Sequence, residues 1–191
     1  MSPRQSDARR RVVSAAAEML ARHGLNATSI RETAKRANAP FGSTYHHFPG
    51  GKHEVVVEAV TLAGERVAES LDYQLQAGIA VGLEGFLAAW RDMLVRSKFR
   101  VGCPVMAAAV EDPIEDIAED VLLAAARVFD DWKNKLSVSL EAEGRDRASA
   151  SGLATLIVAS LEGAIVLCRA QRSITAFDQV CEQLHRLVCH A

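Results

Sequence analysis

Apolar residues recur every three to four positions along most of this 191-residue chain, and the alternation typical of strands is nearly absent. Alanine, leucine, arginine and glutamate, which favour helices, are frequent. The pattern predicts an all-α fold of about nine helices. They are expected at about residues 6–23, 28–37, 40–48, 52–76, 86–98, 104–110, 114–143, 147–172 and 174–189.

Local signals set several of these boundaries. Gly24 can supply the left-handed residue that ends the first helix. Ser29, followed three residues later by Glu32, has the spacing of a capping box at the start of the second helix. Pro40 is expected at the first position of the third helix, where its missing N–H costs nothing. The glycine-rich residues 78–85 are expected to form a joint before the fifth helix.

Charge is divided unevenly along the chain. Residues 1–52 contain nine Lys and Arg against three Asp and Glu, whereas residues 53–191 contain thirteen against twenty-one. The basic segment suits a polyphosphate partner, because each neutralised phosphate releases counterions. A solvated basic face without a partner would explain the charge alone equally well. Residue 52 is the expected boundary between two domains.

Two short predicted helices, 28–37 and 40–48, are joined by a tight turn and preceded by an amphipathic helix. This is the plan of a helix-turn-helix, in which the second helix enters the major groove of DNA and the first braces against the backbone. Thr44 and Phe48 are four positions apart and are expected to face the core. The opposite side would then present Phe41, Gly42, Ser43, Tyr45, His46 and His47.

The run GLNATSIRETAKRANAPFGSTYHHFPGGKHEVV, residues 24–56, is similar to the signature of TetR-family regulators. Its Ala-Pro turn and Pro-Gly-Gly-Lys exit, together with the Gly-Cys-Pro-Val of residues 102–105, resemble the LmrA/YxaF-like subgroup that responds to lincosamide or flavonoid-like compounds. Members of the family are dimeric repressors. The resemblance implies a repressor that binds a palindromic operator as a homodimer and dissociates when a small molecule binds.

Eight residues are expected to bind DNA, seven of them as the resemblance implies and Phe41 by its position on the same helix. Those expected in the major groove are Phe41, Gly42, Ser43 and His46. Those expected at phosphates are Ser29, Tyr45, His47 and Lys52. Lys52 begins a predicted helix, and the free amides there favour a phosphate.

Four positions depart from the family pattern. Asn38 replaces the usual turn glycine, which asparagine can do because it visits the left-handed region. Phe41 stands where lysine is common, so an apolar contact, for example with a thymine methyl, is expected in place of a phosphate contact. Thr44 and His53 replace an aliphatic residue and a glutamate. These departures change the operator that we expect, and they leave the DNA-binding role unchanged.

Residues 53–191 are expected to form a ligand-binding and dimerisation domain. Large side chains there could line a cavity for an apolar or aromatic effector, with two polar anchors, although core packing is the alternative for each. The candidates are Trp90, Met93, Phe99, Met106, Phe129 and Trp132, with Glu162 and Arg169 as the anchors.

The last two predicted helices carry long faces of small and branched residues. In TetR-like proteins the corresponding pair forms a four-helix interface with the same pair of a second subunit, and a twofold dimer would read two half-sites. The residues expected in this interface are Ala154, Val158, Leu161, Ile165, Phe177, Cys181, Leu184 and Val188.

Two alternatives keep the DNA-binding role and change the signal. Cys181, His185 and Cys189 are spaced at four and four on one predicted helix, so a metal or redox sensor is one alternative, with packing as the competing explanation. An architectural DNA-binding protein without a ligand is the other. Because the four cysteines form no CxxC pair, we expect reduced thiols and no resident metal or cofactor.

Several function classes find no support in the residues. The chain lacks a nucleophile elbow, a phosphate-binding loop and an HExxH motif, so we expect no enzymatic activity. No stretch approaches the roughly 18 consecutive apolar residues of a membrane span, and the first residues do not resemble a signal peptide. A cytoplasmic location without membrane contact is expected.

Overall fold

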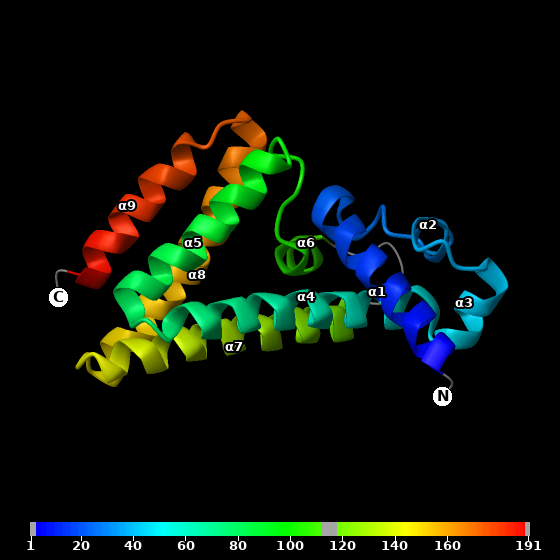
Figure 1. The fold of residues 1–191 in the computed structure, drawn as a ribbon, viewed down its shortest axis with the longest axis horizontal. Helices are drawn as coiled ribbons and strands as arrows, with labels where there is room; N and C mark the ends of the chain where they lie inside the picture. Colours follow the sequence, from blue (N-terminus) through cyan, green and yellow to red (C-terminus); the bar gives the residue numbers. More distant parts are fainter. Residues whose placement is uncertain (1–2, 112–117, 190–191) are drawn as a thin grey trace. The chain divides into compact units, whose positions relative to one another are not determined.

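The computed structural model describes residues 3–111 and 118–189, and in these ranges it contains helices and no strand (Figure 1). Side chains are described for these residues except 3–6, 41, 43, 45 and 118. The prediction of an all-α fold is confirmed. The helices are α1 (Pro3–His23), α2 (Ile30–Arg36), α3 (Phe41–His47), α4 (Gly51–Leu75), α5 (Ile79–Arg96), α6 (Pro104–Val110), α7 (Ala118–Ala142), α8 (Arg147–Gln171) and α9 (Thr175–Cys189).

The chain divides into two compact units. One comprises Met1–Glu65 with Cys103–Val128, and the other comprises Arg66–Gly102 with Phe129–Ala191. Helices α4 and α7 therefore contribute residues to both units. This structural division does not follow the expected boundary at residue 52, and the functional domains 1–52 and 53–191 stay a prediction.

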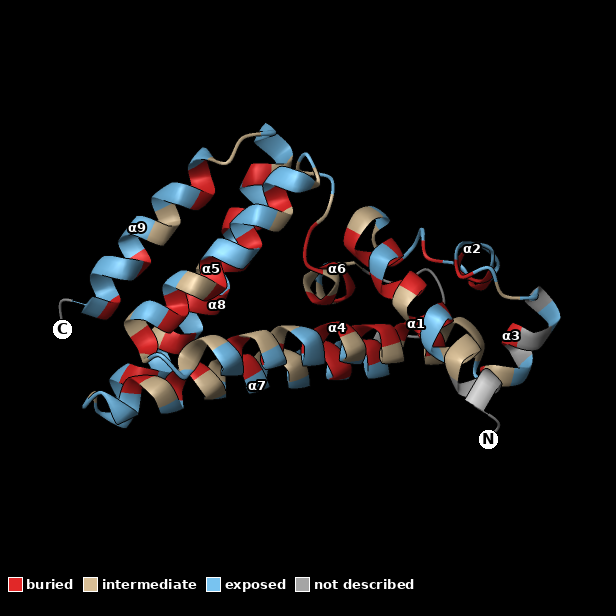
Figure 2. Cartoon of the chain, in the orientation of Figure 1, coloured by how far each residue is buried: buried red, intermediate tan, exposed pale blue. Residues whose placement is uncertain are grey.

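The first unit has a core built around α1, which packs against α2, α3 and α6. Its apolar stripe is buried, as the spacing predicts, while the opposite face is exposed (Figure 2). The buried side chains of this core include Val12, Val13, Ala16, Leu20, Leu25, Ile30, Ala34, Phe48, Val55, Val56, Ala59 and Val60.

The turn between α1 and α2 is held by a carboxylate from the end of α6. Glu111 accepts hydrogen bonds from the backbone N–H groups of Leu25 (3.0 Å) and Asn26 (2.9 Å). Gly24 ends α1 with a left-handed φ of 85°, and the Thr28 hydroxyl donates to its carbonyl at 2.8 Å. The predicted role of Gly24 as the residue that ends the helix is confirmed.

In the second unit α8 packs against α9 and α5, and α5 also packs against α9 (Figure 1). The expectation of a joint over residues 78–85 is wrong, because α5 begins at Ile79. A Cβ atom on Gly82 would lie 2.6 Å from the Gln74 carbonyl oxygen and 2.8 Å from the Cα of Leu75. Glycine is needed there because the backbones of α4 and α5 approach closely.

Other boundaries shift by a few residues. Pro40 is the N-cap of α3, with extended backbone (φ −61°, ψ 129°), and is not its first helical residue as expected. This position suits proline equally well, since the N-cap N–H has no partner within the helix. The start of the predicted seventh helix, residues 114–117, lies outside the described residues.

Helix α8 is long and apolar enough to span a membrane by length and composition alone, with a mean hydropathy of 1.9 over its best 18-residue window. The sequence-based expectation had found no such segment. A helix buried in a globular core has the same length and composition, so these two properties alone do not place α8 in a membrane. Nine residues along α8 are buried, and the helix packs on α5 and α9.

Candidate functional site

One face of α3 is anchored in the core of the first unit. Thr44 and Phe48 are both fully buried, as predicted. The Thr44 hydroxyl donates to the Pro40 carbonyl at 3.2 Å, and the guanidinium carbon of Arg9 lies 4.5 Å from the centre of the Phe48 ring. These contacts determine which side of α3 is turned outward.

The outward side of α3 contains an open position. Gly42 is exposed, and a Cβ atom there would have no neighbouring atom within 4 Å. His46 is exposed and His47 half-buried. The side chains of the other three candidates, Phe41, Ser43 and Tyr45, lie outside the described residues. The backbone at Gly42 is thus accessible to a partner.

Helix α2 and the turn that follows it position α3. The Ser29 hydroxyl accepts from the Glu32 N–H at 3.2 Å, which confirms Ser29 as the N-cap. Asn38 has a φ of 50°, so it occupies the left-handed conformation that the sequence predicts. The turn closes with a hydrogen bond from the Ala39 N–H to the Ala34 carbonyl at 2.9 Å.

The exposed face of α2 is basic, a feature that the sequence analysis did not single out. Arg31, Lys35 and Arg36 are exposed, and no described residue forms an ion pair with them. Arg31 and Lys35, four positions apart, lie on one side of this short helix, and Arg36 follows about 100° further round it. The recurrence of basic residues along the predicted second helix is the sequence signal that could have indicated this basic face. Three exposed cations on the helix before α3 thus extend the basic surface beyond the eight residues predicted for DNA binding.

Arg9, by contrast, is paired with carboxylates inside the first unit. Its guanidinium donates to Glu54 at 2.7 Å and also to Glu58. Burial lowers the pKa of Arg9, but the hydrogen bonds to the two glutamates outweigh this and raise it above its ordinary value. Glu54 also accepts from the Gly50 N–H at 3.0 Å, so this cluster joins α1 to the start of α4.

The start of α4 places the remaining candidate. Lys52 is half-buried in the first turn. The neighbouring His53, which departs from the family pattern, lies with its Nε2 3.0 Å from a carboxylate oxygen of Asp120. His53 is therefore oriented toward α7.

Three of the eight residues predicted to line a cavity are buried, and the other five are half-buried. Trp132 is almost fully buried and meets Phe129 edge to face at 5.5 Å, while Trp90 meets Phe86 in the same way at 6.5 Å. Glu162 is buried on α8. The other candidates are Met93, Phe99, Met106 and Arg169, all half-buried, with Met106 in the first unit.

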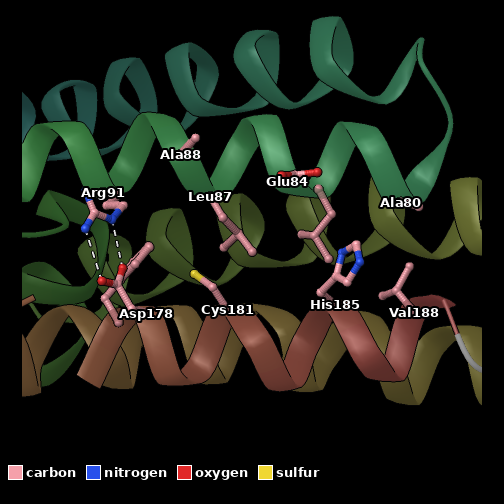
Figure 3. Close-up of a pocket in the computed structure, with 11 residues that line it drawn as sticks. Ala80, Glu84, Leu87, Ala88, Arg91, Asp178, Cys181, His185 and Val188 are labelled. Carbon is pink, nitrogen blue, oxygen red and sulfur yellow. Dashed lines mark hydrogen bonds and ion pairs between the residues drawn. The ribbon is translucent and has the colours of Figure 1, made fainter. Parts of the chain in front are cut away.

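A groove in the second unit lies between α5 and α9 and has a volume of about 350 Å³ (Figure 3). None of the predicted ligand residues lines it. At one end the Arg91 guanidinium makes two hydrogen bonds to Asp178, at 2.8 and 3.1 Å. The other lining residues are Ala80, Leu83, Glu84, Leu87, Ala88, Phe177, Cys181, His185 and Val188.

The cysteine stripe on α9 does not form a metal centre among the described residues, in which no group of three His, Cys, Asp or Glu could hold an ion. Cys189 and His185 are neighbours, with the sulfur 3.6 Å from Nε2. Burial raises the pKa of Cys181 to about 11. A redox-sensing thiol needs the opposite shift, so the sensor alternative gains no support from this geometry.

The residues predicted for the dimer interface lie in the core of the single chain. Seven of them are at most 8% exposed, and only Cys181 is partly accessible. Their contact with a second copy of the chain stays a prediction. The exposed side of α8 and α9 carries a shallow groove that includes one of the predicted interface residues, Leu184. Its lining residues are Leu156, Ser160, Leu167, Ala176, Gln179, Val180, Gln183, Leu184 and Leu187.

Comparisons with known proteins agree with the helix-turn-helix geometry. A family model described as "Bacterial regulatory proteins, tetR family" matches residues 12–59, and one described as "Transcriptional regulator LmrA/YxaF-like, C-terminal domain" matches residues 80–183. An HTH-type transcriptional regulator of Mycobacterium tuberculosis is 37% identical over 94% of this chain and 93% of its own length. The YxaF regulator of Bacillus subtilis is 29% identical over 96% of both chains.

Solved structures share the fold. A TetR regulatory protein from Rhodobacter sphaeroides superposes with a TM-score of 0.82 at 22% identity, covering 94% of this chain and 98% of that one. A TetR regulator from Legionella pneumophila gives 0.81 at 21% identity, covering 92% and 94%. The chain belongs to the TetR family of bacterial transcriptional regulators, on its LmrA/YxaF-like branch. It is a DNA-binding protein of a class that is not enzymatic.

Proposed function

We propose that this regulator is a cytoplasmic repressor that binds a palindromic operator as a homodimer and leaves it when a small molecule binds the second unit. The observation that carries the proposal is the exposed apolar face of α8 and α9. Leu156, Leu167 and Leu187 are each 45–47% exposed and line one shallow groove. Apolar side chains gathered in this way favour burial against another protein surface.

A second copy of the chain is the partner that suits this face. A short α3 reads few bases, whereas a twofold dimer places two such helices on half-sites about one helical turn, or roughly 34–36 Å, apart. The face is mainly apolar with serine and glutamine between the leucines, a composition compatible with an interface between two copies of the chain. The repressor role and the release by ligand rest on the family relationship.

On DNA, α3 would lie in the major groove. The residues that would face base edges are Phe41, Gly42, Ser43 and His46. Those that would contact phosphates are Ser29, Tyr45, His47 and Lys52. We add Arg31, Lys35 and Arg36 to the phosphate contacts, because their exposed charges have no ion-pair partner among the described residues. Counterion release would then make binding steeply dependent on salt.

The experiment that tests the dimer replaces Leu167 by glutamate, with Leu123→Glu on α7 as the matched control, since both leucines are 47% exposed. Sedimentation should show a dimer for the wild type and the control, and a monomer for Leu167→Glu. The monomer should also bind the promoter DNA of its own gene at least tenfold more weakly. A dimer that withstands Leu167→Glu would contradict the proposed interface.

Operator binding itself is tested by titrating the purified dimer against this promoter DNA and against random DNA at several salt concentrations. A preference for the promoter at moderate salt supports the repressor. Lys35→Ala should reduce the slope of log affinity against log salt by about one for each subunit and should leave the sequence preference unchanged. Equal binding to both DNAs would contradict the proposed function.

A further inference from the structure

The groove between α5 and α9 has apolar walls and a polar rim. The buried side chains of Leu83, Leu87 and Phe177 line it, and so do the two small side chains of Ala80 and Ala88 (Figure 3). Cys181 stands at the middle of the α9 wall and is only partly exposed. Because its pKa is raised to about 11, this thiol is neutral at physiological pH and adds to the apolar wall. The interior therefore suits the hydrocarbon part of a small molecule.

The rim of the groove carries an excess of negative charge. From α5 it receives Glu84 and Arg91, and from α9 it receives Asp178 and His185. The two hydrogen bonds between Arg91 and Asp178 pair those charges with each other. Glu84 makes no ion pair with any described residue and is exposed at the opening. One carboxylate is thus available to a ligand.

We propose that this groove binds a small lipophilic amine, with its hydrocarbon body against Leu83, Leu87 and Phe177 and its ammonium group at Glu84. Burial of the apolar body supplies affinity, and the carboxylate selects the charge. An anion of the same shape would face Glu84 and gain no cation, since Arg91 is already engaged by Asp178. This inference rests on the proposed ligand response and names the chemical class of the effector.

Three naphthalene probes of nearly equal size separate the effect of shape from that of charge. They are the cation 2-(2-naphthyl)ethylammonium (the amine), the neutral alcohol 2-(2-naphthyl)ethanol, and the anion of 2-naphthylacetic acid (the acetate). Their binding to the full-length protein without DNA is measured by calorimetry. The amine should bind at least tenfold more tightly than the acetate, with the alcohol between them. Glu84→Gln should reduce the affinity for the amine to that for the alcohol. Equal affinities for all three probes, or no binding of the amine, would overturn the proposal.

The location is tested by filling the groove. Ala88→Trp places a large side chain in it, whereas Ala89→Trp changes the adjacent exposed alanine, which does not line the groove. Binding of the amine should be lost in the first variant and kept in the second. The amine should also slow alkylation of Cys181 and leave exposed Cys189, which is outside this groove, unaffected. Unchanged binding by Ala88→Trp would overturn the assignment.

Ligand binding in the groove and release of DNA by the ligand are measured in separate experiments. The binding measurements contain no DNA, so a failure there overturns the groove as a ligand site whatever the behaviour of the operator complex. A second titration follows the release of promoter DNA by the amine. If the amine binds in the groove and the DNA complex is unaffected, the groove stands as a binding site and the proposed ligand response fails.

Discussion

The carboxylate of Glu111 occupies the space in which a side chain on Gly24 would lie. Glu111 is 87 residues further along the chain and accepts hydrogen bonds from the two amides that follow Gly24, those of Leu25 and Asn26. Gly24 itself has a left-handed φ of 85°. Glycine is thus required there twice, once for its backbone conformation and once for the space that the carboxylate fills.

Gly24→Ala should therefore destabilise the protein by more than backbone strain alone. Gly144→Ala is the matched control, because Gly144 also has a left-handed φ of 97° but its Cβ position is empty. We expect a loss of about 1 to 2 kcal/mol for the control and a larger loss for Gly24→Ala. Urea denaturation measures both free energies of unfolding.

Glu111→Ala provides the second half of this test. It removes two charge-assisted hydrogen bonds at a half-buried site, so we expect a loss of about 1 to 3 kcal/mol. In the double variant Gly24→Ala/Glu111→Ala the steric conflict is absent. Its loss of unfolding free energy should therefore be smaller than the sum of the losses of the two single variants. Strict additivity would show that the two residues do not conflict.

Arg9 should contribute to stability where its neighbour Arg10 does not. Arg9→Met keeps the aliphatic stem but removes the ion pairs with Glu54 and Glu58 and the contact with the Phe48 ring. We expect a loss of about 1 to 2 kcal/mol, discounted for partial solvent screening. Arg10→Met, at a side chain 75% exposed, should change the free energy of unfolding by less than about 0.5 kcal/mol. Equal losses would contradict the structural role of Arg9.

Gly42 should tolerate substitution in the free protein and not on DNA. Its Cβ position is empty, so Gly42→Ala and Gly42→Gln should fold at least as stably as the wild type, since both residues favour a helix over glycine. If α3 lies in the major groove of DNA as proposed, the affinity for promoter DNA should fall as the side chain at position 42 grows, by at least tenfold for glutamine. Fluorescence anisotropy measures it. An unchanged affinity of Gly42→Gln would place Gly42 away from the DNA.

Cys181 should remain protonated until strongly alkaline pH. Because burial raises its pKa to about 11, the thiol form predominates below that value, and about one molecule in a thousand carries the thiolate at pH 8. Alkylation by iodoacetamide of the folded protein, followed by peptide mass analysis, should accelerate tenfold per pH unit up to pH 10. A rate that levels off below pH 9 would contradict the assigned environment and revive the redox alternative.

Local features were predictable from the sequence because the atoms that decide them are close along the chain. The helical period, the Ser29 cap and the left-handed Asn38 each depend on residues within about four positions. The buried side of α3 followed from the spacing of Thr44 and Phe48 for the same reason. The candidate DNA-binding surface could therefore be outlined before the fold was known.

Contacts between distant segments could not be predicted in this way. Nothing near Arg9 in the sequence indicates that two glutamates of α4 hold it, and nothing near Leu25 indicates that the carboxylate of Glu111 accepts its N–H. Periodicity marks an apolar stripe, but it does not say which of several stripes a neighbouring helix covers. The groove between α5 and α9 joins residues about 90 positions apart, so it exists only in the folded chain.

Helix α8 makes the distinction clearest. It is apolar on more than one side, so its sequence alone determined that it is a helix and left open which side is the core. Packing against α5 and α9 decided this by burying Ala154, Leu161 and Ile165 and leaving Leu156 and Leu167 in solvent. The sequence determined the elements because their hydrogen bonds are local. The tertiary structure decided the surfaces, because burial depends on what each element meets.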